Sequence, residues 1–244
     1  MKLLDLTLPT AAENLALDEA LLELVDQADE AADESNFNVL RLWEPTQTMV
    51  VVGRASKVAE EVDIAFCESN QIEILRRCSG GASIVTGPGC LMYSVVLSLH
   101  RHPELRMIER AHSFVLEMIR SGLVDAGIEV QRQGTSDLTI GDRKFSGNSL
   151  RCKRNAILYH GTLLCEMNLE PIFGCLRTAP RQPEYRAQRD HHEFVANLDE
   201  GPNRVRSQLI ASWSADEPLA TWPQAETFKL AKERYSNDSW NFRL

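Results

Sequence analysis

Two strand-like runs and the turn between them decide this fold: Gly134-Thr-Ser-Asp-Leu-Thr-Ile-Gly-Asp-Arg-Lys-Phe-Ser-Gly-Asn-Ser149, followed by Leu158-Tyr-His-Gly-Thr-Leu-Leu164. Polar side chains and glycines surround a single lysine, Lys144, on both sides. A cation held on a sheet beside Asp137, Ser146 and His160 can bind an anionic ligand such as a phosphate or a carboxylate. A second interpretation stays open, namely a plain hairpin whose turn at 141–142 happens to be followed by basic residues.

A second stretch favours the anion-binding interpretation. Arg76-Arg77-Cys78-Ser79-Gly80-Gly81-Ala82 follows the apolar run Ile72-Glu73-Ile74-Leu75 and precedes Ser83-Ile84-Val85. Two arginines, a hydroxyl and two adjacent glycines make a loop in which backbone N–H groups can approach an anion closely. No Gly-Lys-Ser/Thr follows, so this is not a Walker loop. The glycine spacing does not fit a dinucleotide fingerprint either.

Together these stretches resemble the lipoate–protein ligase family, within the wider group that includes biotin–protein ligases and octanoyltransferases. The family pattern has an Arg-Arg-x-Ser-Gly-Gly-Gly loop, an Asp-Leu…Gly-x-Lys-x-Ser-Gly segment and a His-Gly-Thr-Leu-Leu strand, and all three occur here in that order. Further matches lie at Asn14–Ala20, Leu42–Trp43, Val50–Arg54 and Val195–Leu198. The resemblance therefore covers most of the chain.

The resemblance implies roles for residues of the lysine segment. Lys144 is the expected catalytic residue, which contacts the phosphate and the acyl carbonyl of an acyl-adenylate and offsets the charge of an oxyanion. Asp137 is expected to place the nucleotide or its metal. Ser146 and Gly147 let the strand approach the ligand. His160 either positions substrate or is a satisfied core histidine, and both interpretations stay open.

The resemblance also implies that the glycine loop lines the acyl and phosphate path through Arg77, Ser79, Gly80 and Gly81. We expect Arg77 to face the ligand and leave the role of Arg76 open, because alternate strand residues point to opposite sides. Two departures from the family pattern concern the same region. Ala82 replaces the third glycine, and Ile84-Val85-Thr86-Gly87 replaces a Val-Tyr-His-Asp continuation, so a polar pair is missing.

The implied activity is that of a lipoyl ligase. It binds lipoate and ATP, or ready-made lipoyl-AMP, and transfers lipoyl to a lysine of an acceptor domain. The implied acceptors are the lipoyl domains of 2-oxoacid dehydrogenase complexes or the H protein of glycine cleavage. Mg²⁺ is implied by the adenylation chemistry alone, and no protein metal site is predicted. A cysteine-dependent octanoyltransferase and a non-catalytic lipoate-binding protein stay open as alternatives.

The chain reaches Trp240–Leu244 about where the family's large domain ends. We therefore expect a single catalytic domain over residues 1–244 without a C-terminal accessory domain, which in this family can be a separate chain. The absence of an accessory domain and of the polar pair together predict faster lipoyl transfer from supplied lipoyl-AMP than from lipoate and ATP.

Six cysteines lie at positions 67, 78, 90, 152, 165 and 175. None forms a Cys-x-x-Cys pair, which argues against a structural zinc site. We expect reduced thiols that serve mainly as small buried apolar side chains, none of them essential. Cys165 and Cys175 lie in the region where one octanoyltransferase branch carries its nucleophile, but their spacing does not match.

The composition excludes two classes of protein. A net charge of −9 argues against a general nucleic-acid binder. No apolar stretch is long enough to span a membrane, and the start of the chain lacks the features of a signal peptide. We therefore expect a cytoplasmic enzyme with no membrane or nucleic-acid partner.

Hydrophobic periodicity predicts helices interleaved with strand clusters. Expected helices span 12–28, 59–69, 107–127, 169–176, 205–213 and 226–235, and expected strands span 38–43, 48–53, 73–75, 83–85, 91–99, 128–130, 138–140, 144–150 and 157–164. Residues 29–36 are predicted to be a solvated connection and 177–192 a surface segment. This order favours an α/β or α+β fold. The resemblance sharpens it to an α+β fold with mixed, largely antiparallel sheets flanked by helices, like the catalytic domains of biotin and lipoate ligases.

Overall fold

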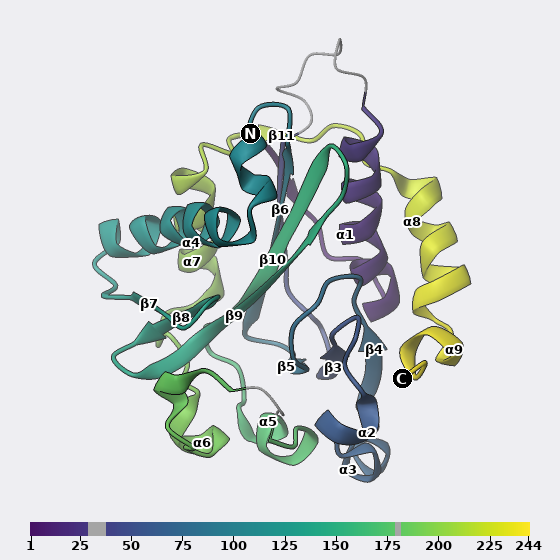
Figure 1. Cartoon of the computed structure of the whole chain (residues 1–244), viewed down its shortest axis with the longest axis vertical. Coiled ribbons are helices and arrows are strands. Elements are labelled where there is room, and N and C mark those ends of the chain that lie inside the picture. Colours follow the sequence, from purple (N-terminus) through teal and green to yellow (C-terminus); the bar gives the residue numbers. More distant parts are fainter. Residues whose placement is uncertain (29–37, 179–181) are drawn as a thin grey trace.

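Two sheets and the helices around them make up the computed structural model, which describes residues 1–28, 38–178 and 182–244 (Figure 1). The larger sheet has eight strands in the order β11-β1-β2-β6-β10-β9-β8-β7, and the smaller has three in the order β4-β3-β5. Strand β1 pairs in parallel with β2 and β11, and β3 pairs in parallel with β4, while the other pairs are antiparallel. The expected α+β class with mixed, largely antiparallel sheets is confirmed.

The strands run over short segments of the chain. They are β1 Lys2–Asp5, β2 Val39–Trp43, β3 Met49–Val52, β4 Glu73–Arg76, β5 Ile84–Thr86, β6 Cys90–Ser98, β7 Gln131–Gln133, β8 Asp137–Ile140, β9 Arg143–Cys152, β10 Ala156–Leu164 and β11 Glu217–Pro218. The helices are α1 Ala11–Asp26, α2 Val58–Glu61, α3 Ile64–Ser69, η2 Pro103–Arg106, α4 Ile108–Asp125, α5 Glu170–Cys175, η3 Glu184–Arg186, α6 His191–Phe194, α7 Pro202–Ser212, α8 Gln224–Leu230, the π-helical η4 Ala231–Tyr235 and α9 Asp238–Asn241.

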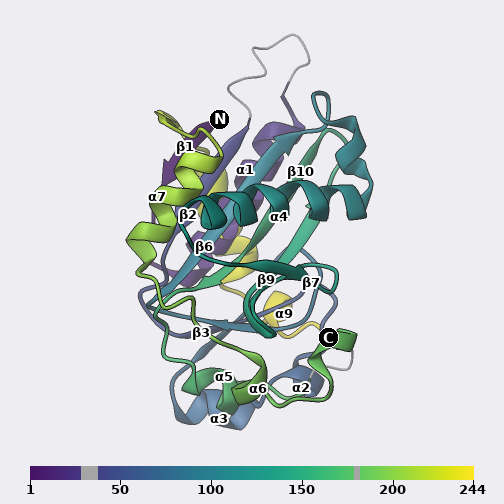
Figure 2. The ribbon, with the colours of Figure 1, turned by 90° about the vertical axis from the view of Figure 1, so that its left-hand side faces the viewer.

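Helices α1 and α4 cover opposite faces of the large sheet. Tyr159 and His160 are neighbours on β10, so their side chains point to opposite sides of the sheet. Tyr159 bonds to His112 of α4, whereas His160 bonds to Asp18 of α1. Figure 2 shows the same arrangement, with α4 and α7 in front of the strands and α1 behind them. The side chain of His160 is thereby held between the sheet and α1.

Helix α1 begins at a capping box, in which the Thr10 hydroxyl accepts from the Glu13 amide and the Glu13 carboxylate accepts from the Thr10 amide. The helix lies between the large sheet and the C-terminal helices α8 and η4. It is buried on nearly every side, and its polar residues Asn14, Asp18 and Glu19 are buried as well. Buried charges require partners, so α1 presents polar groups that the rest of the fold must satisfy.

Several sequence-based expectations were wrong in detail. The helix expected over 59–69 is divided into α2 and α3, because the Asp63 carboxylate accepts the Phe66 amide and starts a second helix. The strand expected over 128–130 lies instead at β7, and the two-stranded edge made by β1 and β11 was missed. The connection expected over 29–36 lies outside the described residues.

The segment predicted to lie on the surface over 177–192 is more structured than expected. Outside residues 179–181, which are not described, it contains η3 and the start of α6. Arg186 of η3 is 6% exposed. No helix among the described residues is both long and apolar enough to cross a bilayer.

Candidate active site

The lysine predicted to be catalytic lies near the start of β9, beside the end of β8. Its ammonium group is 2.8 Å from Oδ1 of Asp137, and the hydroxyl of Tyr185 donates to Oδ2 of the same carboxylate at 2.7 Å. The Lys144 side chain runs forward over Gly147, where an added Cβ would come within 3.0 Å of Nζ. Gly147 therefore gives the lysine its path along the strand, as its small size suggested.

Asn148 links the strands around this lysine, and it was not among the residues predicted for the site. Its amide nitrogen donates to Ser136 O at 2.8 Å and to the Ser146 hydroxyl at 3.0 Å, while its oxygen accepts from the hydroxyl of Tyr93. A Cβ on Gly161 would lie 1.8 Å from that oxygen. The glycine of the His-Gly-Thr-Leu-Leu strand is thus required for Asn148 to occupy this position.

Arg77 follows β4, and its three guanidinium nitrogens all donate to protein oxygens. The acceptors are Val51 O at 3.0 Å, Gly80 O at 2.6 Å, Ala82 O at 2.9 Å and the Ser79 hydroxyl at 3.2 Å. Burial lowers the pKa of this guanidinium to about 10. Arg77 lines the larger cavity, as expected, and in this arrangement it also fixes the shape of the glycine loop.

Arg76 points to the other side of β4, as the strand alternation predicted. Its side chain donates to Trp240 O, Asn241 O, Gly53 O and Ser56 O at 2.7–3.2 Å, and it is 0% exposed. In return, the indole of Trp240 donates to Arg76 O at 2.8 Å. Arg76 therefore joins the chain before the glycine loop to the C-terminal helix α9.

A chain of buried polar groups lies beside the glycine loop. The Ser79 hydroxyl is 2.5 Å from Nε2 of His160, and Nδ1 of His160 is 3.0 Å from Oδ2 of Asp18. Arg41 donates to Oδ1 of Asp18 at 2.5 Å and to the side chain of Asn14 at 2.7 Å. Burial opposes ionisation of Asp18, but Arg41 and His160 together outweigh it and lower the pKa of the carboxyl.

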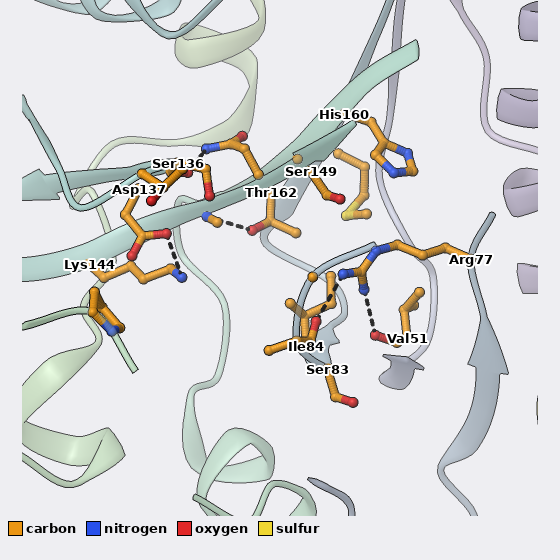
Figure 3. A pocket seen from close by; sticks show the side chains of 18 of the residues that line it. Val51, Arg77, Ser83, Ile84, Ser136, Asp137, Lys144, Ser149, His160 and Thr162 are labelled. Carbon is orange, nitrogen blue, oxygen red and sulfur yellow. Dashed lines mark hydrogen bonds and ion pairs between the residues drawn. The ribbon is translucent and has the colours of Figure 1, made fainter. Parts of the chain in front are cut away.

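Two adjoining cavities share lining residues that include Lys144, and Figure 3 shows the larger of the two. The larger has a volume of about 360 Å³ and extends between the pair Asp137–Lys144 and the pair Arg77–His160. Its remaining lining includes Leu15, Asp18, Val51, Gly81, Ile84, Met92, Ser136, Asn148, Ser149 and Thr162. The smaller has a volume of about 140 Å³, and its lining includes Glu61, Val85, Phe145, Ser146, Leu164, Ile172, Arg177, Arg186, His191 and Phe194.

The fold thus brings most of the predicted site residues to these cavities. Arg77, Gly81, Asp137 and His160 line the larger one, Ser146 lines the smaller, and Lys144 and Gly147 line both. Ser79 and Gly80 lie in the loop just behind, where Gly80 O accepts from Arg77. Sequence reasoning missed several other polar groups at or beside the cavities, among them Asp18, Asn148, Thr162, Tyr185 and His191.

The cysteine thiols lie away from the two cavities. No cysteine is among the described residues that line them, and none of the six thiols is in a disulfide. Cys165 and Cys175 are both buried, and burial raises the pKa of each thiol to about 12. Cys152 is exposed, which differs from the expected burial, and it lies at the far end of β9 from Lys144.

The described residues offer no metal centre of their own. No group of three or more His, Cys, Asp or Glu side chains within 1–28, 38–178 and 182–244 could hold an ion. Asp137 is the carboxylate beside Lys144, and hydrogen bonds already occupy both of its oxygens. Magnesium commonly needs only one or two carboxylates besides substrate phosphates. Each oxygen of Asp137 has one partner and a second lone pair, so this carboxylate could supply one such ligand.

Residues 10–210 match the lipoyl protein ligase A/B catalytic domain family. Lipoate–protein ligase 1 of Staphylococcus aureus is 24% identical, over 94% of this chain and 69% of its own length. Octanoyltransferase LipM of Carboxydothermus hydrogenoformans is 25% identical, over 96% of both chains. Sequence similarity therefore extends to proteins named for two different reactions.

Solved structures show the same fold. A structure from a study of the bi-partite lipoate protein ligase of Thermoplasma acidophilum and its E2 lipoyl domain superimposes with a TM-score of 0.81 at 23% identity, covering 99% of this chain and 95% of that chain. A Thermoplasma acidophilum ligase with bound lipoic acid has a TM-score of 0.81 over 100% of this chain and 99% of that chain. A lipoate-protein ligase A bound with ATP has a TM-score of 0.79 over 99% and 98%. Both of these structures are 23% identical to this chain.

Proposed function

Because the chain belongs to the lipoyl protein ligase A/B catalytic domain family, we propose that it transfers a lipoyl group from lipoyl-AMP to a lysine of an acceptor domain. The observation that carries this proposal is the position of Lys144, which lines both cavities. An acyl-adenylate consists of a tail, a mixed anhydride and a nucleoside. One cation between two adjoining cavities matches that order, with the anhydride at the cation.

We assign the acyl tail to the larger cavity. Leu15, Val51 and Met92 provide apolar walls between its two polar ends. The Lys144 ammonium lies over Gly147, and His160 pairs in register with Ser149. Ser149 is two residues beyond Gly147 on β9, so the positions of the ammonium and of His160 are about 7 Å apart along the strand. A lipoyl or octanoyl chain whose carboxyl carbon lies at Lys144 therefore reaches the level of His160.

We assign the nucleoside to the smaller cavity. Phe145, Leu164, Ile172 and Phe194 give it apolar surfaces against which a flat base can pack. Burial, with the nearby Arg186, lowers the pKa of His191 to about 4, so this ring is neutral near pH 7. It offers hydrogen bonds to the nucleoside rather than a charge to the phosphate. The positive charge at the anhydride comes from Lys144.

The transfer step uses this charge in a simple way. The amine of the acceptor lysine attacks the acyl carbon and forms the new C–N bond, the C–O bond to phosphate breaks, AMP leaves with the electron pair, and the amine proton goes to solvent. Negative charge collects on the acyl oxygen and on the phosphate, where the Lys144 ammonium offsets it. Asp137 holds the lysine ready, and Tyr185 remains as its partner when the lysine turns to the substrate.

The proposal also includes adenylation, the earlier step that makes lipoyl-AMP. The lipoate carboxylate attacks the α-phosphorus of ATP and pyrophosphate leaves, which gives lipoyl-AMP. Where the family pattern has a polar pair, Thr86 is buried against Met92, and Gly87 packs against Thr48. These positions offer no charged group to a nucleotide. Faster transfer from supplied lipoyl-AMP than from lipoate and ATP stays a prediction.

A second candidate function is octanoyl transfer from an acyl-carrier thioester, favoured by the match to an octanoyltransferase over 96% of both chains. A cysteine-dependent mechanism needs a thiolate at the cavity. The buried Cys165 and Cys175, with pKa values raised to about 12, do not supply one. The site chemistry therefore favours the adenylate route.

The test compares acyl donors on one acceptor, an E2 lipoyl domain, with mass spectrometry of the acceptor as the readout. We expect lipoylation with lipoyl-AMP, and with lipoate only when ATP is present. The octanoyl thioester of acyl carrier protein should give no product. Modification from the thioester without ATP, together with a trapped acyl-cysteine, would replace the proposal by the transferase. If none of the donors modified the acceptor, the chain would be a non-catalytic lipoate-binding protein instead.

A further inference from the structure

The hydroxyl that bonds to Asp137 beside Lys144 comes from outside the sheet. It belongs to Tyr185, which lies in η3 and donates to the carboxylate at 2.7 Å. The chain continues from η3 through α6 and returns to β9, where the Ala196 amide donates to Lys144 O at 3.0 Å. The place of the Tyr185 hydroxyl therefore depends on how the turn between η3 and α6 is held.

This turn has a backbone conformation that residues with a side chain rarely adopt. Ala187 and Gln188 follow one another with φ angles of 49° and 61°. Both values lie in the left-handed region, where the Cβ of an ordinary residue crowds the backbone. Two such residues in succession persist only where the surrounding contacts fix them. The turn therefore needs bonds from elsewhere in the chain to keep its shape.

Arg189 supplies bonds of this kind. Its Nη2 donates to Tyr185 O at 2.9 Å and to Asp142 O at 3.0 Å, and its Nη1 donates to the Asp142 carboxylate at 2.7 Å. Its Nε donates to Arg186 O at 3.1 Å. Asp142 lies in the turn between β8 and β9. One guanidinium thus joins the residue that carries the hydroxyl to the hairpin of β8 and β9.

We propose that Arg189 is a positioning residue for the transfer step, because it holds the Tyr185 hydroxyl on Asp137. The inference rests on the proposed function, since it takes Lys144 as the cation that stabilises the transition state. Asp137 is 7% exposed, so its carboxylate would lack a partner when Lys144 turns to the substrate. The hydrogen bond from Tyr185 offsets that cost, and the offset is largest where negative charge on the substrate is largest.

Arg189 acts through its neighbours and not by contact with the substrate. It is not among the described residues that line either cavity, and each of its three guanidinium nitrogens already donates to a protein oxygen. Its guanidinium carbon also lies 5.4 Å from the centre of the Phe194 ring, which lines the smaller cavity. An effect through Phe194 would weaken the binding of lipoyl-AMP, whereas an effect through Tyr185 would lower the rate after binding.

The test is pre-steady-state lipoyl transfer by the whole chain to an E2 lipoyl domain, measured over a range of lipoyl-AMP concentrations. We expect Tyr185→Phe and Arg189→Ala each to lower the rate at saturating lipoyl-AMP by about tenfold, the scale of one hydrogen bond to a charged group. The concentration that gives half the maximal rate should change by less than about twofold, because the lost interaction belongs to the transition state. The double variant should transfer as Tyr185→Phe does, since it has no hydroxyl left to position.

Arg204→Ala is the matched control. Arg204 also joins a carboxylate, that of Glu200 at 2.6 Å, to a backbone carbonyl, Ala126 O at 2.9 Å, and it lines neither cavity. Its transfer rate should equal that of the wild type. Asp142→Ala removes the exposed partner of Arg189 and should lower the rate in the same way by a smaller factor, and it replaces Arg189→Ala if circular dichroism shows that variant to be unfolded.

Three results would overturn the inference and leave the ligase proposal standing. They are a wild-type rate in the variant that removes the bond between Arg189 and Asp142, a change confined to the half-saturating concentration of lipoyl-AMP, and a double variant that is much slower than Tyr185→Phe. If the wild type transferred no lipoyl from lipoyl-AMP, the proposed function would fail and the inference with it.

Discussion

The two ends of the larger cavity are built differently. At the lysine end, the Lys144 side chain is 28% exposed and pairs with Asp137, whose second oxygen is held by Tyr185. At the histidine end, the side chains of Arg41 and Asp18 are 0% and 4% exposed. The lysine end thus offers a cation that can change partners, and the histidine end offers buried groups that are paired with one another within the protein.

This difference predicts that changes at the two ends have different consequences. A partly exposed ion pair contributes little to stability, so the lysine end is free to serve the reaction. A buried pair that loses one partner leaves an uncompensated charge in the interior. Substitutions at the histidine end should therefore lower stability, and substitutions at the lysine end should lower turnover.

Asp18→Asn should have the largest effect, because it leaves the buried Arg41 guanidinium without its counter-charge. We expect the free energy of unfolding to fall by about 3–5 kcal/mol, measured by urea denaturation at pH 7. Lys153→Ala also breaks ion pairs with carboxylates, those of Glu23 and Asp26, but at the surface. It should stay within about 0.5 kcal/mol of the wild type. Equal losses of unfolding free energy in the two variants would show that burial of the ion pair makes no difference to its contribution.

Lys144→Ala should lower the rate of lipoyl transfer by on the order of 10² to 10³, as when one electrostatic stabiliser is removed. The free energy of unfolding should change by less than about 1 kcal/mol, because the pair with Asp137 is partly exposed. Single-turnover transfer from lipoyl-AMP is the measurement, and Lys153→Ala is the activity control. Near-normal transfer in Lys144→Ala would remove this lysine from the mechanism.

Gly161→Ala should disturb the lysine end from the neighbouring strand. The new Cβ would lie 1.8 Å from Oδ1 of Asn148, so the Asn148 side chain must move. Its amide nitrogen then loses the hydrogen bond that it donates to Ser136 O, beside Asp137. We expect a loss of about 1–3 kcal/mol of stability together with slower transfer. Gly80→Ala is the control for stability alone, since its Cβ would meet nothing within 4 Å. Wild-type stability in Gly161→Ala would show that Asn148 can move freely.

The stability contributed by the histidine end should depend on pH, because it includes the buried carboxyl of Asp18. The pKa of Asp18 is lowered in the folded chain, from about 3.9 in the unfolded one. The stabilisation linked to this shift is therefore present above pH about 4 and is lost as the pH falls through the lower folded pKa. The stability difference between the wild type and Asp18→Asn, measured by urea denaturation, should shrink between pH 5 and pH 3. A constant difference would contradict ionisation of Asp18 as its source.

The smallest effect is expected for the cysteines. Cys152→Ser and Cys165→Ala should leave the transfer rate unchanged, because neither thiol lies among the described lining residues of the cavities. Circular dichroism checks the fold of each variant, since the buried Cys165 also contributes packing. A folded Cys165→Ala that cannot transfer would return the octanoyltransferase mechanism to consideration.

The sequence predicted the lysine end of the cavity better than the histidine end. Asp137 and Lys144 are close in sequence and lie on two strands joined by one turn, where Asp137 pairs with Gly147 and the Lys144 side chain runs over that glycine. Asp18 meets His160 across 142 positions, and only the packing of α1 against β10 brings them together. His160 has partners for both ring nitrogens and also lines the larger cavity, so the two interpretations left open for it do not exclude each other.

The fold itself was predictable to a similar degree. Long periodic or apolar segments such as α4 and β6 carry a strong signal in their own residues, and they lie where expected. Strands β1 and β11 are short and gain their identity only by pairing with each other and with β2. The break between α2 and α3 depends on one capping carboxylate, Asp63. Features created by contacts between distant segments were the ones missed.

The bonds of Arg76 set an order of events during synthesis of the chain. Its side chain and backbone are satisfied by Trp240 and Asn241, which the ribosome adds long after the glycine loop itself. A nascent chain that has not yet reached Asn241 exposes a guanidinium that has no acceptor in α9. The residue that precedes the glycine loop therefore gains part of its hydrogen bonding only after residues 240 and 241 have been added, while Gly53 O and Ser56 O are available to it earlier.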